Sequence, residues 1–223
     1  ARKKITMADI EEASLKVKLG PSKKRLQDDL EKEMTAYHEA GHAIIAHILP
    51  HADPVHRISI VSRGRALGFT LTPPERDKLQ TTKSELLDRI TVMMGGRAAE
   101  LLIFKEQTAG ASNDIKQATR IARAMVMEYG MSELGPMNFD PMYESSEYGQ
   151  AWGEAIKVSD SMQEKIDDAT REIIEVCQEN AIVLLKKYQK TLISVSNKLI
   201  DVESLDADEF AKLMAIPKAK PSR

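Results

Sequence analysis

The sequence predicts a mainly α-helical protein with a small β-hairpin and a long helical region towards its C-terminus. Aromatic residues make up only 4% of the 223 residues, whereas alanine, lysine, glutamate, leucine, isoleucine and methionine are plentiful, a composition that favours helices. Apolar residues recur every three or four positions over most of the chain, which is the spacing of one helix face. The hydrophobic content of 42% suffices for an apolar core and is too high for a disordered chain.

Charge and cysteine content exclude several classes of protein. The formal net charge of −2 gives no sign of a basic surface, so we expect no nucleic-acid partner. The single cysteine, Cys177, cannot form an internal disulfide, and we expect it to be a small apolar residue on a helix in a reducing compartment. No apolar run approaches the roughly 18 residues that cross a bilayer, and no signal peptide opens the chain. Because the sequence begins with Ala1, we expect a fragment whose membrane or motor parts lie elsewhere.

The N-terminal segment is expected to be a helix followed by a boundary. Residues 6–19, "TMADIEEASLKVKL", start with Thr6 three positions before Asp9, as in a capping box. Gly20 and Pro21 end this helix and mark a domain boundary. The charged stretch "SKKRLQDDLEKE" then leads, as a solvated face, into a second helix.

Residues 56–72 break the helical pattern. Ile58, Ile60 and Val61 favour a strand, the turn-like "SRGRA" follows, and "LGFTLT" alternates again, so we expect a β-hairpin. Two roles fit this hairpin equally well. It is either an edge that binds an extended polypeptide by strand addition or a hairpin packed within the domain.

Helical patterns return after the loop "TPPERDKL" at residues 72–79. Residues 81–103 predict a helix that is interrupted at Gly95-Gly96. The loop "TAGASND" then runs into a helix from Asp114 to about Tyr129.

The last third of the chain is expected to be strongly helical. The turn-rich residues 130–153 are expected to be irregular. Residues 156–199 predict one long helix, or a hairpin of two helices with a break near Asn180, packed against the rest of the domain. Residues 201–214, "DVESLDADEFAKLM", predict a short last helix, and a frayed tail follows.

Residues 36–45, "AYHEAGHAII", place two histidines and a glutamate in an apolar helix. Side chains four positions apart share a helix face, so His38 and His42 can both reach one zinc ion. Glu39 lies about 100° further round, where it can take a proton from a water on the ion but cannot easily share the ion. Burying these groups without a metal would cost several kcal/mol. Gly41 costs the helix roughly 1 kcal/mol relative to alanine, which indicates close packing near the ion.

A catalytic zinc ion needs a third protein ligand. The metzincin pattern requires glycine and histidine three and six residues after the second histidine, where Ile45 and Ile48 stand, so that class is excluded. His47 points elsewhere on the helix, and His51 and His56 lie in the following loop and strand start. We expect none of these three histidines to be a ligand.

Two acidic residues are candidates for the third ligand. Glu100, in "GGRAAE", lies at a separation compatible with a thermolysin-like glutamate ligand. Asp114, in "TAGASND", begins a helix, where an acid can equally complement the helix dipole or cap free N–H groups. Spacing alone does not choose between them.

Several motifs, taken in order, resemble the peptidase domain of FtsH-type ATP-dependent zinc metalloproteases. They are "MTAYHEAGHAIIAHIL", "GGRAAE", "TAGASNDIKQATRIARAMVMEYGMSELGP" and "ESLDADEF". The resemblance covers nearly all of residues 31–215 and implies a helical zincin-type peptidase fold. It implies that Zn²⁺ is bound by His38, His42 and the aspartate of "NDI", Asp114. It also implies that Glu100 orients a ligating histidine by accepting its second ring N–H.

The same resemblance implies a domain organisation and partners. Residues 1–30 are similar to the end of the ATPase module's helical lid and its linker, residues 31–215 form the peptidase domain, and residues 216–223 form a disordered tail. The family is expected to degrade unfolded or tagged polypeptides as a homohexamer driven by its own ATPase module. Its membrane anchor would hold this domain on the cytoplasmic face of the bacterial inner membrane, or on the matrix or stromal side in an organelle. The sequence contains no G-x-x-x-x-G-K-[ST] loop, so the ATPase is expected outside this chain.

Two other functions fit parts of the sequence. A structural zinc domain is normally closed by four ligands, often cysteines, and Cys177 lies far from the histidines. A helical oligomerisation module would self-associate through residues 156–199 and need no metal. The alternative to a peptidase combines features of both: a helical oligomerisation module that binds zinc but does not catalyse a reaction.

Overall fold

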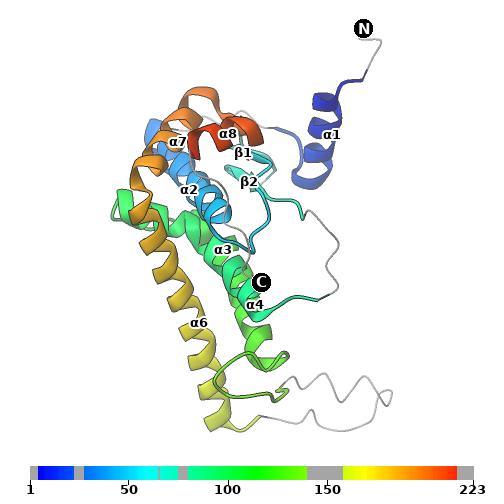
Figure 1. Cartoon of the computed structure of the whole chain (residues 1–223), viewed down its shortest axis with the longest axis vertical. Helices are drawn as coiled ribbons and strands as arrows, with labels where there is room; N and C mark the ends of the chain where they lie inside the picture. The colour runs from blue at the N-terminus through cyan, green and yellow to red at the C-terminus, as the bar shows by residue number, and fades with distance from the viewer. Residues whose placement is uncertain (1–4, 23–27, 65, 75–79, 140–157, 215–223) are drawn as a thin grey trace.

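The computed structural model describes residues 5–22, 28–64, 66–74, 80–139 and 158–214. Helices account for most of these residues and are accompanied by one small antiparallel sheet, so the predicted mainly α fold is confirmed. The elements are α1 (Met7–Leu19), α2 (Asp29–Ile48), β1 (Arg57–Ser59), β2 (Phe69–Leu71), α3 (Lys83–Ile103), η1 (Ala109–Ala111), α4 (Ser112–Met127), α6 (Asp160–Lys187), α7 (Gln189–Val202), β3 (Ser204–Asp206) and α8 (Ala207–Met214). In Figure 1 the long helices form the body, and α7, α8 and the sheet gather at one end.

Some sequence-based expectations fall outside the described part of the chain. They concern residues 23–27 of the charged stretch, residue 65 of the hairpin turn, residues 75–79 of the expected loop, residues 140–153 of the expected irregular stretch, residues 156–157 of the expected long helix, and the expected tail at 216–223. Among the described residues, no helix combines the length and the apolar character needed to cross a membrane.

The predicted N-terminal helix and its capping box are confirmed in α1. Thr6 accepts a hydrogen bond from the N–H of Asp9, and the Asp9 carboxylate accepts one from the N–H of Thr6. The helix ends at Gly20, whose φ of 92° is readily reached only by glycine. The Glu12 carboxylate pairs with the Arg63 guanidinium at 2.6 Å, which joins α1 to the turn of the hairpin.

The hairpin predicted at residues 56–72 is confirmed, and a third strand extends it. β1 pairs antiparallel with β2, with Ile58 opposite Thr70, and β3 pairs with the other side of β1, with Leu205 opposite Ile58. In the described part of the chain the strand order is β2-β1-β3, so β2 lies at one edge of the sheet. The prediction of a single helix at 201–214 is wrong for residues 201–206, because α7 ends at Val202 and Ser204–Asp206 form β3 through pairing with β1; only Ala207–Met214 form the last helix.

Helices α2 and α3 cross where both carry glycine. A Cβ on Gly41 would collide with the carbonyl oxygen of Gly95 and lie 2.9 Å from the Cβ of Ala99. The close packing expected at Gly41 is therefore confirmed. The predicted interruption at Gly95-Gly96 is wrong, since α3 continues through both residues. These glycines allow the close approach of α2 and do not end a helix.

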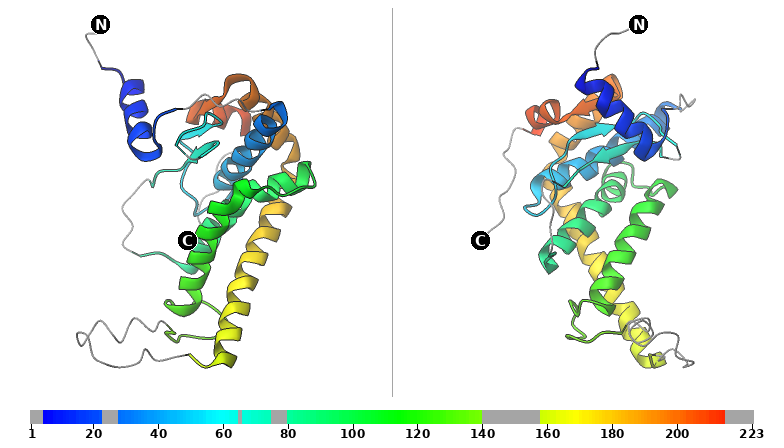
Figure 2. Two further views of the ribbon diagram at one scale, coloured as in Figure 1. Left: turned by 180° about the vertical axis from the view of Figure 1, so that it is seen from behind. Right: turned by 90° about the vertical axis from the view of Figure 1, so that its right-hand side faces the viewer.

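The C-terminal region contains two helices, and α7 bends away from the end of α6 to pack on α2, so they do not form a hairpin (Figure 1). α6 and α7 meet at Tyr188, so the break predicted near Asn180 comes too early along the chain. The long helix α6 lies along α3 and α4, as Figures 1 and 2 show, and buries Ile166, Cys177 and Leu185. Packing against the rest of the domain is thereby confirmed, and Cys177 lies on a helix as predicted, with an exposed fraction of 1%.

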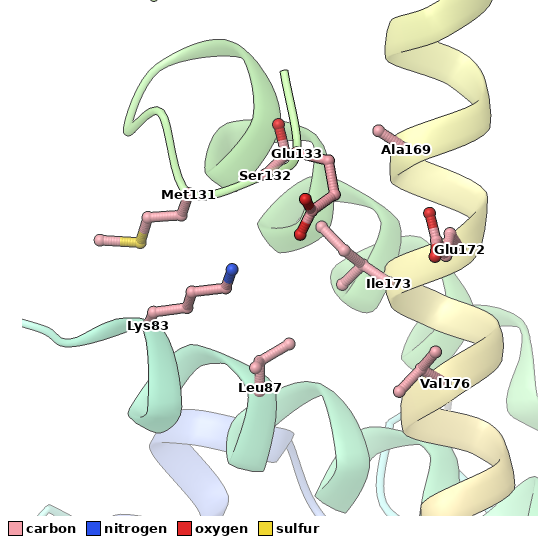
Figure 3. Close-up of a pocket in the computed structure, with 9 residues that line it drawn as sticks. All are labelled: Lys83, Leu87, Met131, Ser132, Glu133, Ala169, Glu172, Ile173 and Val176. Carbon is pink, nitrogen blue, oxygen red and sulfur yellow. The ribbon is translucent and has the colours of Figure 1, made fainter. Parts of the chain in front are cut away.

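The main apolar core lies between α2, α3, α6 and α7, with fully buried residues such as Ile44, Ile90 and Leu199. A pocket of about 210 Å³ opens at the side of this body, between α3, α6 and the segment that follows α4 (Figure 3). Its lining residues are Lys83, Leu87, Met131, Ser132, Glu133, Ala169, Glu172, Ile173 and Val176. No residue of the H-E-x-x-H motif lines this pocket, so the candidate site lies elsewhere.

Candidate metal centre and catalytic base

The two motif histidines lie on the most buried part of α2. Every residue of this helix from Thr35 to Ala46 is buried. His38 and His42 stand one helical turn apart, as predicted, and their Nε2 atoms are 3.1 Å from each other. Their rings are nearly perpendicular, at 78°. Two ring nitrogens therefore converge on one point inside the protein.

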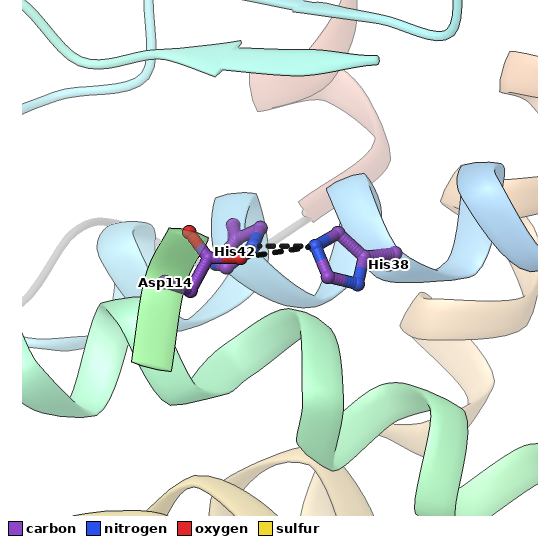
Figure 4. A group of neighbouring side chains, drawn as sticks. All are labelled: His38, His42 and Asp114. Carbon is purple, nitrogen blue, oxygen red and sulfur yellow. Dashed lines mark hydrogen bonds and ion pairs between the residues drawn. The ribbon is translucent and has the colours of Figure 1, made fainter. Parts of the chain in front are cut away.

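Asp114 reaches the same point from the first turn of α4, as Figure 4 shows. Its Oδ2 atom lies 3.3 Å from Nε2 of His38 and 3.5 Å from Nε2 of His42. No side chain caps the start of α4, so capping of free N–H groups does not account for this acid. Within the described residues, these three side chains are the one group of histidine, cysteine and acidic residues that could hold a metal ion.

The separations between these atoms suit a tetrahedral metal ion. Zinc bonds to histidine nitrogen and carboxylate oxygen are about 2.0–2.1 Å long, which in a tetrahedral arrangement puts neighbouring ligand atoms about 3.3 Å apart. The three observed separations run from 3.1 to 3.5 Å. Three protein ligands leave the fourth position free, which is the pattern of catalytic zinc sites rather than structural ones.

Hydrogen bonds to the other ring nitrogens direct both Nε2 atoms at the metal position. The Nδ1 atom of His42 lies 2.7 Å from the carbonyl oxygen of Val92, which can only accept a hydrogen bond. The Nδ1 atom of His38 lies 2.7 Å from Oε1 of Glu100. Because Nδ1 donates in both rings, Nε2 of each neutral ring has its lone pair free to bind a cation.

Glu100 lies behind His38 and is not part of the metal-ligand group. Its side chain is 2% exposed, and Thr108 donates to it twice, from the backbone N–H to Oε2 at 2.8 Å and from the hydroxyl to Oε1 at 3.1 Å. Gly96 packs against the His38 ring, because a Cβ there would collide with the ring. Glu100 and Asp114, the two candidates for the third ligand, thus lie at different nitrogens of the His38 ring: Glu100 at Nδ1 and Asp114 at Nε2.

The charges of the His38 ring and of the Asp114 and Glu100 carboxylates stabilise one another. Although burial acts to lower the pKa of His38, the Asp114 and Glu100 carboxylates raise it to about 10. Burial acts to raise the pKa values of both carboxyls, but hydrogen bonds from the histidines hold them below their usual values. A divalent cation would replace the proton between Nε2 and Asp114 with a larger positive charge, so the donor set fits a metal.

Glu39 is buried one position from His38 and faces the hairpin. Its carboxylate accepts a hydrogen bond from the hydroxyl of Thr70, on β2, at 2.8 Å. Burial raises the pKa of this carboxyl above its usual value. A raised pKa suits a group that must take up a proton and release it again.

The three remaining histidines, His47, His51 and His56, make contacts away from the candidate metal centre. The ring of His47 packs edge-on against Phe210, and the backbone N–H of His51 donates to Asp88. His56 belongs to the start of the hairpin and pairs through its backbone with Leu71. In the described part of the chain, none of these histidines belongs to the metal-ligand group.

Sequence reasoning missed three contributors to the site: the carbonyl of Val92 and the hydroxyls of Thr70 and Thr108. A backbone carbonyl has no sequence signal. Thr70 belongs to the alternating pattern "LGFTLT", which predicts a strand but not the helix that it faces. Thr108 opens "TAGASND", where a hydroxyl residue before a helix start indicates a cap, and it does cap η1.

Comparison with known proteins places this site in a family. The sequence profile described as Peptidase family M41 matches residues 25–213. The chain is 41% identical over 215 residues to "ATP-dependent zinc metalloprotease FtsH 1" of Conexibacter woesei, a match covering 96% of this chain and 33% of that protein. It is 45% identical over 213 residues to the protein of that name in Thermoanaerobacter sp. strain X514, covering 95% of this chain and 35% of that protein.

A third relative, "ATP-dependent zinc metalloprotease FtsH" of Thermotoga maritima, is 42% identical over 217 residues, covering 96% of this chain and 36% of that protein. The chain therefore spans about a third of the length of these relatives. Because the family profile matches most of the sequence and the relatives match nearly all of it, the chain belongs to peptidase family M41.

Proposed function

We propose that this chain is a zinc-dependent endopeptidase domain that hydrolyses peptide bonds in unfolded polypeptides. The observation that carries the proposal is the convergence of His38, His42 and Asp114 next to the buried carboxylate of Glu39. Three ligands with a free fourth position suit catalysis, whereas a structural zinc site would be closed by four ligands.

The side chains divide the chemistry between them. His38, His42 and Asp114 would hold Zn²⁺, which supplies the Lewis acidity that activates a water and polarises the scissile carbonyl. Glu39 accepts the proton of the attacking water and passes it to the leaving amine. Glu100 keeps His38 in the orientation that directs Nε2 at the metal position.

Strand β2 is the proposed binding surface for the substrate backbone. It lies at the edge of the sheet in the described part of the chain, and its residue Thr70 contacts Glu39. An extended polypeptide that adds to this edge uses its main-chain groups for binding, which gives affinity with little sequence specificity. Low sequence specificity suits a peptidase that acts on many unfolded proteins.

The longer relatives suggest how the domain is used. We propose that residues 1–30 form the end of an ATPase lid and its linker, residues 31–215 the peptidase domain and residues 216–223 a flexible tail. The relatives are named ATP-dependent, so we propose that an ATPase module of the same polypeptide delivers substrates. We further propose a homohexamer, anchored in a membrane by segments outside this chain, with this domain on the cytoplasmic face of the bacterial inner membrane or its organellar equivalent.

The Glu39→Gln variant tests the proposal. Glutamine keeps the size of the side chain but cannot accept the proton, so we expect zinc content to stay near one per chain while casein cleavage falls by roughly 10²- to 10⁴-fold. Cleavage by the parent chain should also disappear after treatment with a chelator and return with zinc. Undiminished cleavage by the variant or by the stripped protein contradicts the proposal. A chain that binds zinc but never cleaves casein supports the non-catalytic oligomerisation module instead.

A further inference from the structure

The hydroxyl of Thr70 holds the carboxylate of Glu39 from the side of the sheet. It lies 2.8 Å from Oε2 of Glu39 and 3.1 Å from the backbone carbonyl oxygen of the same residue, so its one proton is shared between them. Glu39 is 6% exposed. Among the described residues, no other side chain forms a hydrogen bond with this carboxylate. Its orientation therefore depends on one residue of β2.

Gly68 bounds the same carboxylate two positions earlier along the hairpin. A Cβ on Gly68 would lie 2.8 Å from both Cγ and Oε1 of Glu39, and equally close to the carbonyl oxygen of Ser59. One carboxylate oxygen is thus held by Thr70, and the other lies against the backbone at position 68. The segment that leads into β2 has no room for a side chain there, and it leaves the carboxylate little freedom to turn.

A general base must lie within about 2.6–3.2 Å of the proton that it removes. Glutamate has several rotatable bonds, and a displacement of about 1 Å in a catalytic group can cost roughly 100-fold in rate. We propose that Thr70 is a positioning residue whose hydroxyl holds Glu39 ready to accept the proton of the attacking water. The inference deepens the proposed peptidase function and rests on it.

Two other roles for Thr70 predict different kinetics. If its hydroxyl only fastens the hairpin to α2 through the backbone carbonyl of Glu39, its removal lowers thermal stability and leaves kcat of the folded protein unchanged. If Thr70 only contacts the substrate on β2, its removal raises KM. Positioning of the base predicts a fall in kcat at nearly constant KM, with the metal still bound.

The test uses the whole 223-residue chain loaded with zinc and a fluorogenic peptide substrate. Thr70→Val removes the hydroxyl, keeps the side-chain shape and retains a residue that favours strands. We expect kcat to fall roughly 10- to 100-fold, KM to stay within about twofold, and zinc affinity, measured by chelator competition, to stay within about twofold. Thr70→Ser keeps the hydroxyl and should recover most of the lost kcat.

Thr119→Val is the matched control, because within the residues that the structure describes the Thr119 hydroxyl donates only to the backbone of its own helix, at Ile115. It should change neither kcat nor KM. If Thr70→Val is unfolded by circular dichroism, Thr70→Ala takes its place, since a smaller side chain introduces no clash. The inference is overturned if removal of the hydroxyl leaves kcat intact, if the loss appears wholly in KM, or if serine fails to restore activity. The proposed function fails separately, if the parent chain cleaves nothing or Glu39→Gln remains active.

Discussion

At the scale of single residues, hydrogen bonds at Nδ1 fix the tautomer that His38 and His42 adopt when their rings are neutral. Nδ1 of one ring donates to a carboxylate and Nδ1 of the other to a backbone carbonyl, so both lone pairs are presented at Nε2. Asp114 adds an oxygen within 3.5 Å of both nitrogens. Glu100 is equally acidic but lies on the Nδ1 side of His38. Position relative to the ring, rather than residue type, separates a proposed ligand from a residue that orients a ligand.

This difference predicts how zinc affinity responds to removal of each acid. Asp114→Ala removes a bond to the metal and should weaken zinc binding well beyond 100-fold. Glu100→Ala removes only a hydrogen bond to a ligand, for which losses of about 10- to 100-fold are usual. Competition with a chromophoric chelator measures both affinities. Asp160→Ala is the control, because Asp160 is also a first-turn acid but lies on α6. The reverse order of losses would make Glu100 the ligand.

At the scale of elements, local patterns predicted what depends on local chemistry. The capping box at Thr6, the hairpin and the helix face shared by the two histidines follow from spacings within a few residues, and the structure contains all three. Strand β3 and the continuity of α3 through Gly95 depend on contacts between distant segments, which no local pattern encodes. The third ligand was ambiguous for the same reason, because sequence separation does not give distance in space until the fold is known.

The close crossing of α2 and α3 at Gly41 predicts that a larger residue there will destabilise the protein. In an isolated helix, alanine at position 41 would gain about 1 kcal/mol over glycine. Here its Cβ would collide with the backbone of Gly95, which cannot move aside like a flexible side chain, and overpacking of this kind costs about 1–3 kcal/mol. With about 2 kcal/mol for overpacking, the net cost is about 1 kcal/mol, so we expect Gly41→Ala to lower the melting temperature of the zinc-free protein by about 2–4 °C.

Thermal unfolding in the presence of a chelator measures this effect of packing separately from any effect on metal binding. Ser194→Ala, at an exposed position of α7, should leave the melting temperature unchanged or raise it slightly, because alanine is the better helix former. A Gly41→Ala protein as stable as its parent would mean that α2 and α3 can separate at little cost.

At the scale of the whole molecule, the candidate metal centre joins helices that an apolar core already holds in place. His38 and His42 come from α2 and Asp114 from α4, and both helices contribute buried residues to the main apolar core, such as Ile44 from α2 and Ala122 and Met125 from α4. A domain with such a core does not need the ion in order to fold, unlike a zinc finger. The ion should nonetheless stabilise the folded state, because the unfolded chain has no preformed site.

Removal of zinc should therefore lower the melting temperature without unfolding the protein at room temperature. Free zinc at 100 times its dissociation constant contributes about 2.7 kcal/mol. In a domain of this size, each kcal/mol shifts the melting temperature by about 2–4 °C, so the difference between zinc-loaded and stripped protein should be about 5–10 °C. Asp114→Ala, measured under the same two conditions, should show little or no shift. Far-UV circular dichroism at 25 °C should remain helical after stripping; a collapse of that signal would mean that the ion, and not the apolar core, holds the helices together.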